Sequence, residues 1–289
     1  MAFPGLVKAN NLSDIADKEK AWDNLGLAIN YPYDPSSDLD FQAYINAVEA
    51  ADGASLEPEV KVAIFSFITE CKLDGTWNAI KASCILAGAR TLAGALVPLV
   101  GAAPTNVGGL FVAGDYNRKT GLVGNAGSKY LLSNRFENSD PQNNFHISTY
   151  VTQADTNYAL APARFLMGTG RSDFNCFSHL LVSSSAIIAR VKTGAGVTIG
   201  GTFASMLGFI GASRSAVNSY GLRRGNNTLP ASDASASPST NNIAIFRDSQ
   251  LIQPTNARLA FYSIGESLDL ALLDTRVTAL INAFAAILP

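Results

Sequence analysis

The hydrophobic pattern of the chain changes twice, from a helical period near the N-terminus to a strand-like alternation in the middle, and back again. From 105 to about 264, short runs of β-branched and aromatic residues alternate with clusters of Gly, Asn, Ser and Asp, which form turns. The clearest runs are 145–151, 179–183, 187–192, 197–203 and 242–247. Because no long helical pattern separates them, they predict an antiparallel β-sandwich of the jelly-roll type and not βαβ units.

Three short amphipathic helices are predicted before this β region. The first has apolar residues at 41, 44, 45 and 48, with Ser37 or Asp38 as its cap and Gly53 as its end. The second begins near Pro58, and the third begins between Asp74 and Trp77 and continues to about 87. Together these helices would form a small bundle.

A helical period returns at 267, with apolar residues at 270, 273, 277, 280, 281, 284, 287 and 288. Asp269 is well placed for the positive end of this helix. So continuous a stripe must be covered, either by the chain's own β body or by another subunit. The patterns therefore predict a mainly β chain with helical flanks. Its parts are an N-terminal attachment arm (1–37), a small helical domain (38–104), a β-sandwich (105–266) and a C-terminal helix packing on the body (267–289).

Composition and charge argue against several classes of function. The formal net charge is −2 at pH 7, and only Arg223 and Arg224 sit together, so nucleic-acid binding is not expected. Three cysteines without CxxC or CxxH spacing argue against a disulfide framework and a zinc site. The N-terminus lacks a basic segment followed by an apolar one, so synthesis in a cytoplasm without a secretory signal is expected. Arg90 and Pro98 interrupt the apolar run 85–100, which is also shorter than the roughly 20 residues of a membrane span, so no membrane insertion is expected.

The N-terminal arm contains one short predicted helix, which Ser13 or Asp14 can cap. Its apolar residues are Leu12, Ile15, Trp22 and Leu25. Such a short piece cannot bury Trp22 by itself. Either Trp22 packs on the chain's own helices, or the arm inserts into another subunit, and the four apolar residues are the candidates for attachment.

Several strings along the chain resemble structural proteins of tailed bacteriophages, of the cyanophage type. They are the arm segment 11–26, the run 74–92, Gly-Asp-Tyr-Asn-Arg at 114–118, Gly-Leu-Val-Gly-Asn at 121–125 and Phe-Tyr-Ser-Ile-Gly at 261–265. In the proteins that they resemble, a helical segment precedes a laminin-G or concanavalin-like jelly roll.

This resemblance implies a virion structural protein, and most specifically a tail fibre. Such a protein attaches to other virion proteins by its N-terminal arm and displays its β-sandwich to polysaccharide on the host cell surface. The resemblance also implies a homotrimer, located in the virion on the tail or head surface. A capsid decoration or head-fibre protein is the structural alternative, and a glycan depolymerase is the enzymatic rival.

Sugar binding would use aromatic rings that stack on sugar faces, together with amide or Arg donors at loop ends. Residues of these types in the β region are Tyr116, Asn117, Arg118, Tyr158, Arg171, Phe174, Tyr220 and Arg223. Any one of them is more often simply a residue at the end of a strand. The polar stretch 226–241 is predicted to be a surface loop, the kind of segment in which recognition usually lies.

Candidate catalytic groups are few. His146 and His179 lie in strand-like runs without an acidic neighbour at two or four residues, and they are expected to face solvent. The acids of the β region fall in turn-like contexts; they are Asp115, Glu137, Asp140, Asp155, Asp173, Asp233 and Asp248. Asp115 with Asn117, or Asp140 with its neighbouring asparagines 138 and 143, offers oxygen ligands for Ca²⁺, but simple turns also account for these residues. No enzymatic activity, metal or cofactor is therefore predicted.

Overall fold

The computed structural model describes residues 38–156, 163–170, 172, 175–183, 186–200, 206–250 and 252–289. The predicted attachment residues Leu12, Ile15, Trp22 and Leu25 lie outside this part of the chain, and so do the predicted sugar-binding residues Tyr158, Arg171 and Phe174. The contacts group Asp38–Pro289 into one unit.

The predicted helices at 38–53, 58–73 and the C-terminus are confirmed. In α2 (Leu39–Asp52), the Asp38 carboxylate accepts hydrogen bonds from the backbone of Asp40 and Phe41, and Gly53 ends the helix in the left-handed conformation. The next helix, α3 (Pro58–Leu73), begins with a proline in its first turn. Asp269 caps α5 (Leu270–Ile287) by accepting from two backbone amides of its first turn.

The third predicted helix is wrong, because the segment forms a short 3-10 turn, η2 (Trp77–Ala79), and then a strand, β1 (Ile80–Ile85). This strand is buried on both faces: Ile80 and Ile85 pack with the helices, whereas Ala82 and Cys84 face the interior of the sandwich. The run does alternate, as Ile-Lys-Ala-Ser-Cys-Ile, but apolar residues at 77, 80, 84 and 87 also fit a helical period, so periodicity alone does not distinguish the two in so short a segment. Only a single turn of helix, α4 (Leu92–Ala95), follows it.

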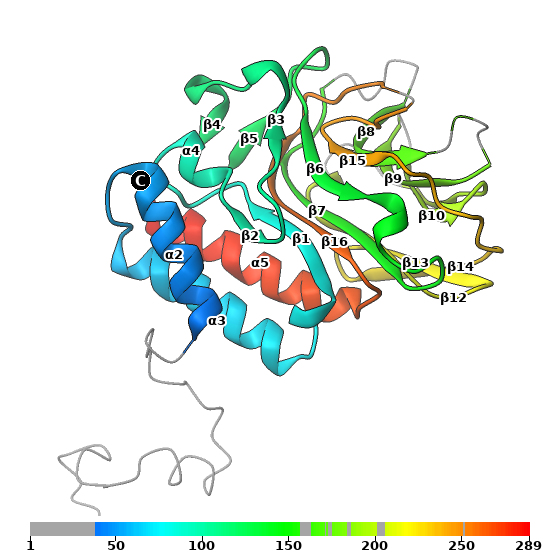
Figure 1. Ribbon diagram of the computed structural model, residues 1–289, viewed down its shortest axis with the longest axis horizontal. Helices are drawn as coiled ribbons and strands as arrows, with labels where there is room; N and C mark the ends of the chain where they lie inside the picture. The colour runs from blue at the N-terminus through cyan, green and yellow to red at the C-terminus, as the bar shows by residue number, and fades with distance from the viewer. Residues whose placement is uncertain are drawn as a thin grey trace, which may run out of the picture. The chain divides into compact units, whose positions relative to one another are not determined.

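Two antiparallel sheets form the β body (Figure 1), as predicted. Within the described residues, the larger sheet has nine strands, seven of them in the order β14-β13-β12-β7-β16-β1-β2, with β5 pairing β16 and β4 pairing β5. The other sheet has seven strands in the order β11-β10-β9-β8-β15-β6-β3. Every pairing between these strands is antiparallel.

The remaining strands of the nine-stranded sheet are β2 (Pro98–Val100), β4 (Tyr116–Asn117), β5 (Gly121–Val123), β7 (Phe145–Gln153), β12 (Gly208–Ala216), β13 (Ser219–Arg224), β14 (Asn227–Ser232) and β16 (Arg258–Gly265). Those of the seven-stranded sheet are β3 (Thr105–Asn106), β6 (Leu131–Phe136), β8 (Arg164–Gly170), β9 (Phe177–Val182), β10 (Ala186–Thr193), β11 (Val197–Gly200) and β15 (Asn242–Ile245). Short 3-10 turns η3 (Val107–Gly109), η4 (Ala113–Asp115) and η5 (Glu137–Ser139) lie in the connections.

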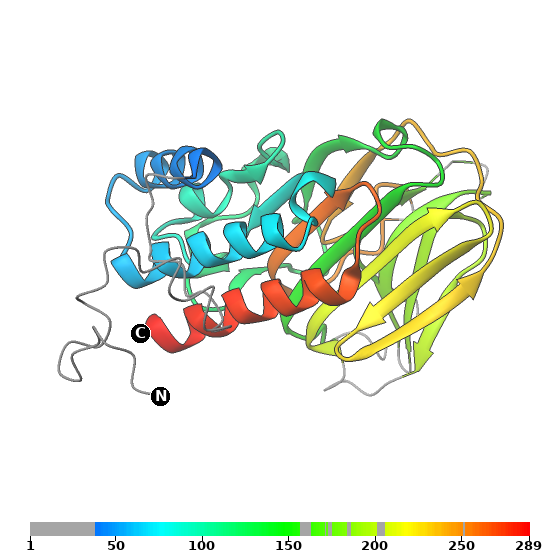
Figure 2. The ribbon, with the colours of Figure 1, turned by 90° about the horizontal axis from the view of Figure 1, so that it is seen from below.

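Two apolar cores hold three layers together. The first lies between the sheets, with Ile147 and Tyr262 contributed by the nine-stranded sheet and Leu180 by the other. The second lies between the helices and the outer face of the nine-stranded sheet, where the rings of Phe67 on α3 and Phe261 on β16 are 5.8 Å apart. Helices α3 and α5 lie side by side in this layer (Figure 2). The nine-stranded sheet is therefore the middle layer, with helices on one face and the second sheet on the other.

The polar stretch 226–241 is not a loop throughout, because its first part is strand β14, paired along its length with β13. Its side chains are exposed or half-buried, and the half-buried Leu229 and Ala231 pack against the core between the sheets. An edge strand is stabilised by backbone pairing on one side only, and polar side chains on such a strand are ordinary. The prediction of a surface loop is correct in exposure and wrong in secondary structure for these six residues.

Candidate functional site

A polar pocket lies where α5 meets the outer face of β12 and β13. Its volume is 490 Å³, and it is lined by Tyr150, Gly208, Phe209, Arg223, Gly225, Asn226, Asp274, Thr275, Thr278, Ala279 and Asn282. We call it the Arg223 pocket. Its wall thus combines two aromatic rings, two amides, two hydroxyls and one pair of opposite charges.

The pocket contains an ion pair, formed by Arg223 and Asp274, that several hydrogen bonds hold in place. The Arg223 Nε donates to Asp274 Oδ2 at 2.8 Å, and the exposed fractions of the two side chains are only 11% and 9%. The other carboxylate oxygen of Asp274 accepts from Thr278 Oγ1 at 3.0 Å. The Arg223 Nη1 donates to Thr228 Oγ1 at 3.0 Å, across the β13–β14 hairpin. Both ends of the ion pair are therefore fixed in place by neighbouring hydroxyls.

The alternation of β13 explains why Arg223 faces the pocket. Tyr220 and Leu222 point into the core between the sheets, so Gly221 and Arg223 point to the opposite face. On α5, Leu273 and Val277 pack inward, and Asp274 and Thr278 follow each of them by one residue on the side toward β13. Burial also raises the pKa of Tyr150, whose hydroxyl hydrogen-bonds with Thr278.

A second polar hollow of 360 Å³ adjoins the first. Its lining includes Ser213, Ser215, Thr228, Ser267 and the helix cap Asp269. Thr228, which accepts from Arg223, belongs to this lining, so the Arg223–Thr228 hydrogen bond separates the two hollows. Together they form a strip of hydroxyl, amide and charged groups between α5 and the exposed hairpin β13–β14.

Among the predicted sugar-binding residues, Arg223 and Tyr220 occupy different environments although both lie on β13. Arg223 lines the pocket. Tyr220 is 4% exposed and lies in the core, where its hydroxyl donates to the carbonyl oxygens of Ala189 at 3.3 Å and Ala195 at 3.1 Å. The position of its ring assigns it a part in packing, and ligand binding by Tyr220 stays an untested prediction.

The other three described candidates lie together near the start of α3, away from the Arg223 pocket. The Tyr116 hydroxyl donates to the Ala89 carbonyl at 2.7 Å. The Arg118 guanidinium donates to both carboxylate oxygens of Glu57, at 3.1 and 2.7 Å, and Glu57 is the residue that precedes α3. Asn117 Oδ1 accepts from the backbone of Lys119 and Thr120, both at 3.0 Å, which closes the turn into β5. Of these contacts, the Arg118–Glu57 pair joins the β4–β5 turn to the start of α3, and sugar binding by the three residues remains a prediction.

The Arg118–Glu57 contact should contribute measurably to stability, because two parallel charge-assisted hydrogen bonds are stronger than a simple surface ion pair. It is also the main reason that the pKa of Glu57 is lowered to about 2. We expect Arg118→Met to lower the free energy of unfolding by about 1–2 kcal/mol. Urea denaturation followed by circular dichroism measures this. Lys119→Met, next in the chain, is the control and should change stability by less than about 0.5 kcal/mol; equal effects of the two variants would refute a special role of Arg118.

Both histidines are buried, so the expectation that they face solvent is wrong. His146 Nδ1 lies 2.5 Å from the Glu266 carbonyl oxygen and Nε2 lies 2.8 Å from Ser263 Oγ. Nδ1 must donate to the carbonyl, so the neutral ring accepts at Nε2 from the serine hydroxyl. His179 Nδ1 lies 3.4 Å from Asp248 Oδ2. Burial lowers the pKa of both rings, to about 4 for His146.

Most of the acids considered for catalysis hold local structure. Asp155 accepts from Thr255 Oγ1 at 2.5 Å, Asp140 pairs with Arg135, and Glu137 accepts from the Ser239 backbone at 2.6 Å. Asp115 pairs with Lys129 at 2.6 Å, which engages the oxygens considered for Ca²⁺. Within the described ranges, no three His, Cys, Asp or Glu side chains gather as a metal-binding group would require. Binding of Ca²⁺ stays an untested prediction, and Asp173 lies outside the described residues.

The sequence analysis missed Asp274, Thr278 and Tyr150 as members of the pocket. A signal for Asp274 exists, because it lies among the apolar positions that α5 buries. A carboxylate in such a stripe needs a partner, and a search for that partner would have pointed to an arginine. Nothing in the sequence, however, indicates that the partner lies on β13.

Comparisons with known proteins concern the fold alone. No protein-family model and no curated protein matches the sequence. The binding domain of botulinum neurotoxin serotype D aligns over 70% of this chain and 50% of its own, with a TM-score of 0.45 and 11% identity. The LG4-5 domains of the mouse laminin alpha1 chain align over 47% of this chain and 39% of their own, with a TM-score of 0.33 and 12% identity.

A third similar structure is the CBM40 of the Ruminococcus gnavus IT-sialidase. It aligns over 48% of this chain and 83% of its own, with a TM-score of 0.34 and 12% identity. The aligned region spans half or less of the toxin and laminin chains. None of the three is a virion protein by name. At such low identity and TM-score these similarities support no inference about function, and the β-sandwich rests on the strand order described above.

Proposed function

We propose that this chain is a non-enzymatic carbohydrate-binding protein and that the Arg223 pocket holds the sugar. The observation that carries this proposal is the desolvated Arg223–Asp274 pair at 2.8 Å in a pocket with aromatic and amide walls. Sugars present neighbouring hydroxyls, which both donate and accept, and flat apolar faces that pack on aromatic rings. A site of this composition therefore matches sugar chemistry better than it matches a purely apolar ligand.

Donors remain available in the pocket for such a ligand. A guanidinium has five N–H donors. Within the described residues, Arg223 uses its Nε for Asp274 and one Nη1 hydrogen for Thr228. The side chains of Asn226 and Asn282 are exposed at the pocket and can each donate and accept. The neighbouring serine-rich hollow would extend the site to more than one sugar unit.

The resemblance to structural proteins of tailed bacteriophages supports a specific form of this proposal. In that form the chain is a tail fibre: its N-terminal arm joins the virion, and the Arg223 pocket recognises polysaccharide on the host cell. Trimeric assembly follows from the same resemblance. Mass spectrometry of purified particles tests this form directly, because a protein missing from the virion cannot be a fibre.

A sugar-binding measurement separates the proposal from a purely structural role. We expect the recombinant full chain to bind glycans on an array, and Asn226→Ala with Asn282→Ala to weaken that binding at least tenfold while the melting temperature stays within about 2 °C of wild type. Both asparagines are exposed, so their loss should not unfold the protein. Asn78→Ala, an exposed asparagine far from the pocket in sequence, is the matched control.

Two outcomes would count against the proposal. Binding that is unchanged in the double variant would place the sugar elsewhere, and no binding to any glycan would favour a decoration or other structural role. The enzymatic rival makes a different prediction, since a depolymerase releases reducing sugar from the polysaccharide that it binds. Release of reducing sugar by the purified chain would refute the non-enzymatic assignment.

A further inference from the structure

Helix α5 is more apolar than its burial requires. Its mean hydropathy is 1.5 over 18 residues, yet only 39% of those residues are buried in the protein. By length and composition it is the one helix in the described ranges that could cross a membrane. It nevertheless packs on the protein's own core through residues such as Leu273, Val277 and Phe284. The unburied residues of α5 lie on two sides: Thr275, Thr278 and Asn282 line the polar Arg223 pocket, whereas Ala283 and Ile287 contribute to an apolar surface toward α3.

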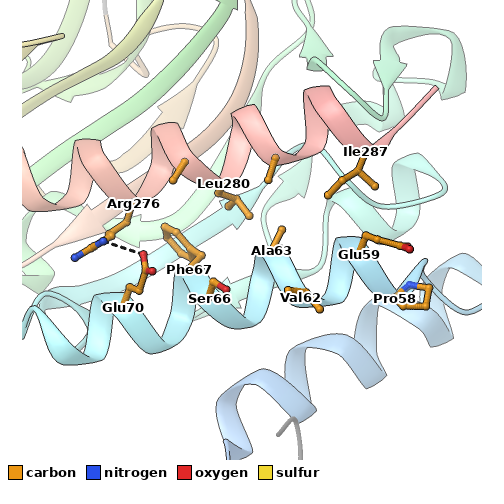
Figure 3. A pocket seen from close by; sticks show the side chains of 12 residues that line it. Pro58, Glu59, Val62, Ala63, Ser66, Phe67, Glu70, Arg276, Leu280 and Ile287 are labelled. Carbon is orange, nitrogen blue, oxygen red and sulfur yellow. Dashed lines mark hydrogen bonds and ion pairs between the residues drawn. The ribbon is translucent and has the colours of Figure 1, made fainter. Parts of the chain in front are cut away.

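Part of that surface forms an open groove with α3, of 630 Å³ (Figure 3). Phe67 from α3 and Leu280 from α5 lie deepest, and both are nearly fully buried. The sides of the groove are lined by small residues, which are Ala63 on α3 and Ala279 and Ala283 on α5. Val62, at the rim, is 40% exposed although it is a large apolar residue. A groove with low walls and an apolar floor lets the backbone of another helix approach closely.

The charges at this groove are mostly acidic. Arg276 donates to Glu70 at 2.9 Å and to both carboxylate oxygens of Asp74, at 2.7 and 3.0 Å, so two acids already neutralise the single cation. Figure 3 shows the Arg276–Glu70 pair at one end of the groove. Glu59 lies toward the other end, and within the described part of the chain it has no ion-pair partner. Both ends of the groove therefore favour positive charge.

We propose that the groove between α3 and α5 docks an amphipathic helix of a partner protein, with an apolar stripe and a Lys or Arg at each end. From Glu59 to Glu70, α3 advances about 16 Å, so the groove accommodates about three turns. Apolar side chains at i, i+3 or i+4, and i+7 of the partner would fill it, in the manner of other helix-in-groove complexes. The acidic ends repel the anionic headgroups that attract peripheral helices to membranes, which favours a protein partner over a lipid surface.

A pair of designed peptides tests this proposal on the full chain. Each peptide has the same amphipathic helix, with Leu and Ala in an apolar stripe about three turns long; one carries Lys and Arg at both ends of that stripe, and its twin carries Glu there. We expect the basic peptide to bind in fluorescence anisotropy and the acidic twin to bind at least tenfold more weakly. The difference should shrink as salt rises, because salt screens exposed charges.

Variants of the groove make the test specific. Val62→Glu places a charge at an exposed position on the apolar rim of the groove, and Glu59→Lys reverses the charge at one end of the groove. Each variant should weaken binding of the basic peptide at least tenfold. Leu39→Glu is the matched control, because Leu39 is 78% exposed and lies on α2 outside the groove. Unchanged binding in both groove variants, or equal binding of the two peptides, would overturn the proposal. If the chain binds anionic lipid vesicles and Val62→Glu abolishes that binding, the groove is a membrane-binding surface. If the chain self-associates and the same variant abolishes self-association, the groove binds a second copy of the chain. Either result would refute the proposal of a partner helix.

Discussion

Gly121→Ala is expected to prevent the chain from accumulating as a folded protein. Gly121 begins β5, where its φ of +96° is a conformation that residues with a Cβ rarely adopt. An added Cβ would lie 2.2 Å from the Leu259 carbonyl oxygen and 2.8 Å from the Ala260 Cα, both backbone atoms of β16. Since β16 pairs with β1, β5 and β7, it cannot move aside without loss of several pairings. Strain and overpacking together should cost about 4 kcal/mol or more, a large fraction of the stability of an ordinary domain.

The matched control for this variant lies seven residues earlier. Gly114 has no atom within 4 Å of the position that a Cβ would occupy, and its φ is not in the left-handed region. Gly114→Ala should therefore change the free energy of unfolding by less than about 1 kcal/mol, in either direction. Soluble yield and thermal unfolding by circular dichroism compare the two variants. A melting temperature of Gly121→Ala within about 2 °C of wild type would show that β5 and β16 do not approach as closely as described.

The free energy of unfolding is expected to fall by about 3 kcal/mol between pH 6.5 and pH 4 through His146 alone. Burial lowers the pKa of this ring from its usual 6.5 to about 4. In the unfolded chain the ring takes up a proton below pH 6.5, whereas in the folded protein it stays neutral until about pH 4. The stabilisation is therefore complete above pH 6.5 and is lost as the pH falls toward 4, at about 1.4 kcal/mol per pH unit. Burial lowers the pKa of His179 as well, so it acts in the same direction.

Urea denaturation at a series of pH values measures this loss, and His146→Gln isolates its source. The glutamine amide can donate to the Glu266 carbonyl and accept from Ser263, as the neutral ring does, but it does not titrate. Between pH 6.5 and pH 4, the free energy of unfolding of the variant should fall by about 3 kcal/mol less than that of the wild type. The carboxylates of Glu49, Glu57 and Glu266, whose pKa values are lowered, act mainly below pH 4.5 and are present in both proteins. An identical pH dependence in the two proteins would mean that His146 is not the group responsible.

The sequence predicted the fold class well, because two-residue alternation and turn formers are local signals. The runs at 145–151 and 187–192 became β7 and β10. Asp38, one of two cap candidates for α2, and Asp269, expected at the positive end of α5, both cap their helices. The prediction of a helix over residues 80–85 was wrong for a physical reason. The segment's apolar residues at 80 and 84, with 77 and 87 on either side, fit a helical period as well as a period of two, and the pairing with β16 that selects the strand lies far along the chain.

The candidate site could be predicted only in part. Arg223 was selected by residue type, but its partner Asp274 lies 51 residues later on a different element, and only the packing of α5 brings the two together. His146 shows the same limit, since its two partners lie in and after β16, more than a hundred residues away. Pairings between distant segments decide which polar residues become buried. A single sequence does not specify these pairings.

The pairing of β1 with β16 determines when this protein can complete its fold. Ser83 on β1 donates to the Tyr262 carbonyl on β16, 179 positions later in the sequence, and α5 comes after β16. On the ribosome, at about 5–20 residues per second, the early helices and β1 would emerge on the order of ten seconds or more before the segments that cover them. During that interval their apolar side chains have no native contacts, which makes the nascent chain a substrate for chaperones and a source of aggregation. Production of the recombinant protein should therefore benefit from low temperature and from co-expressed chaperones.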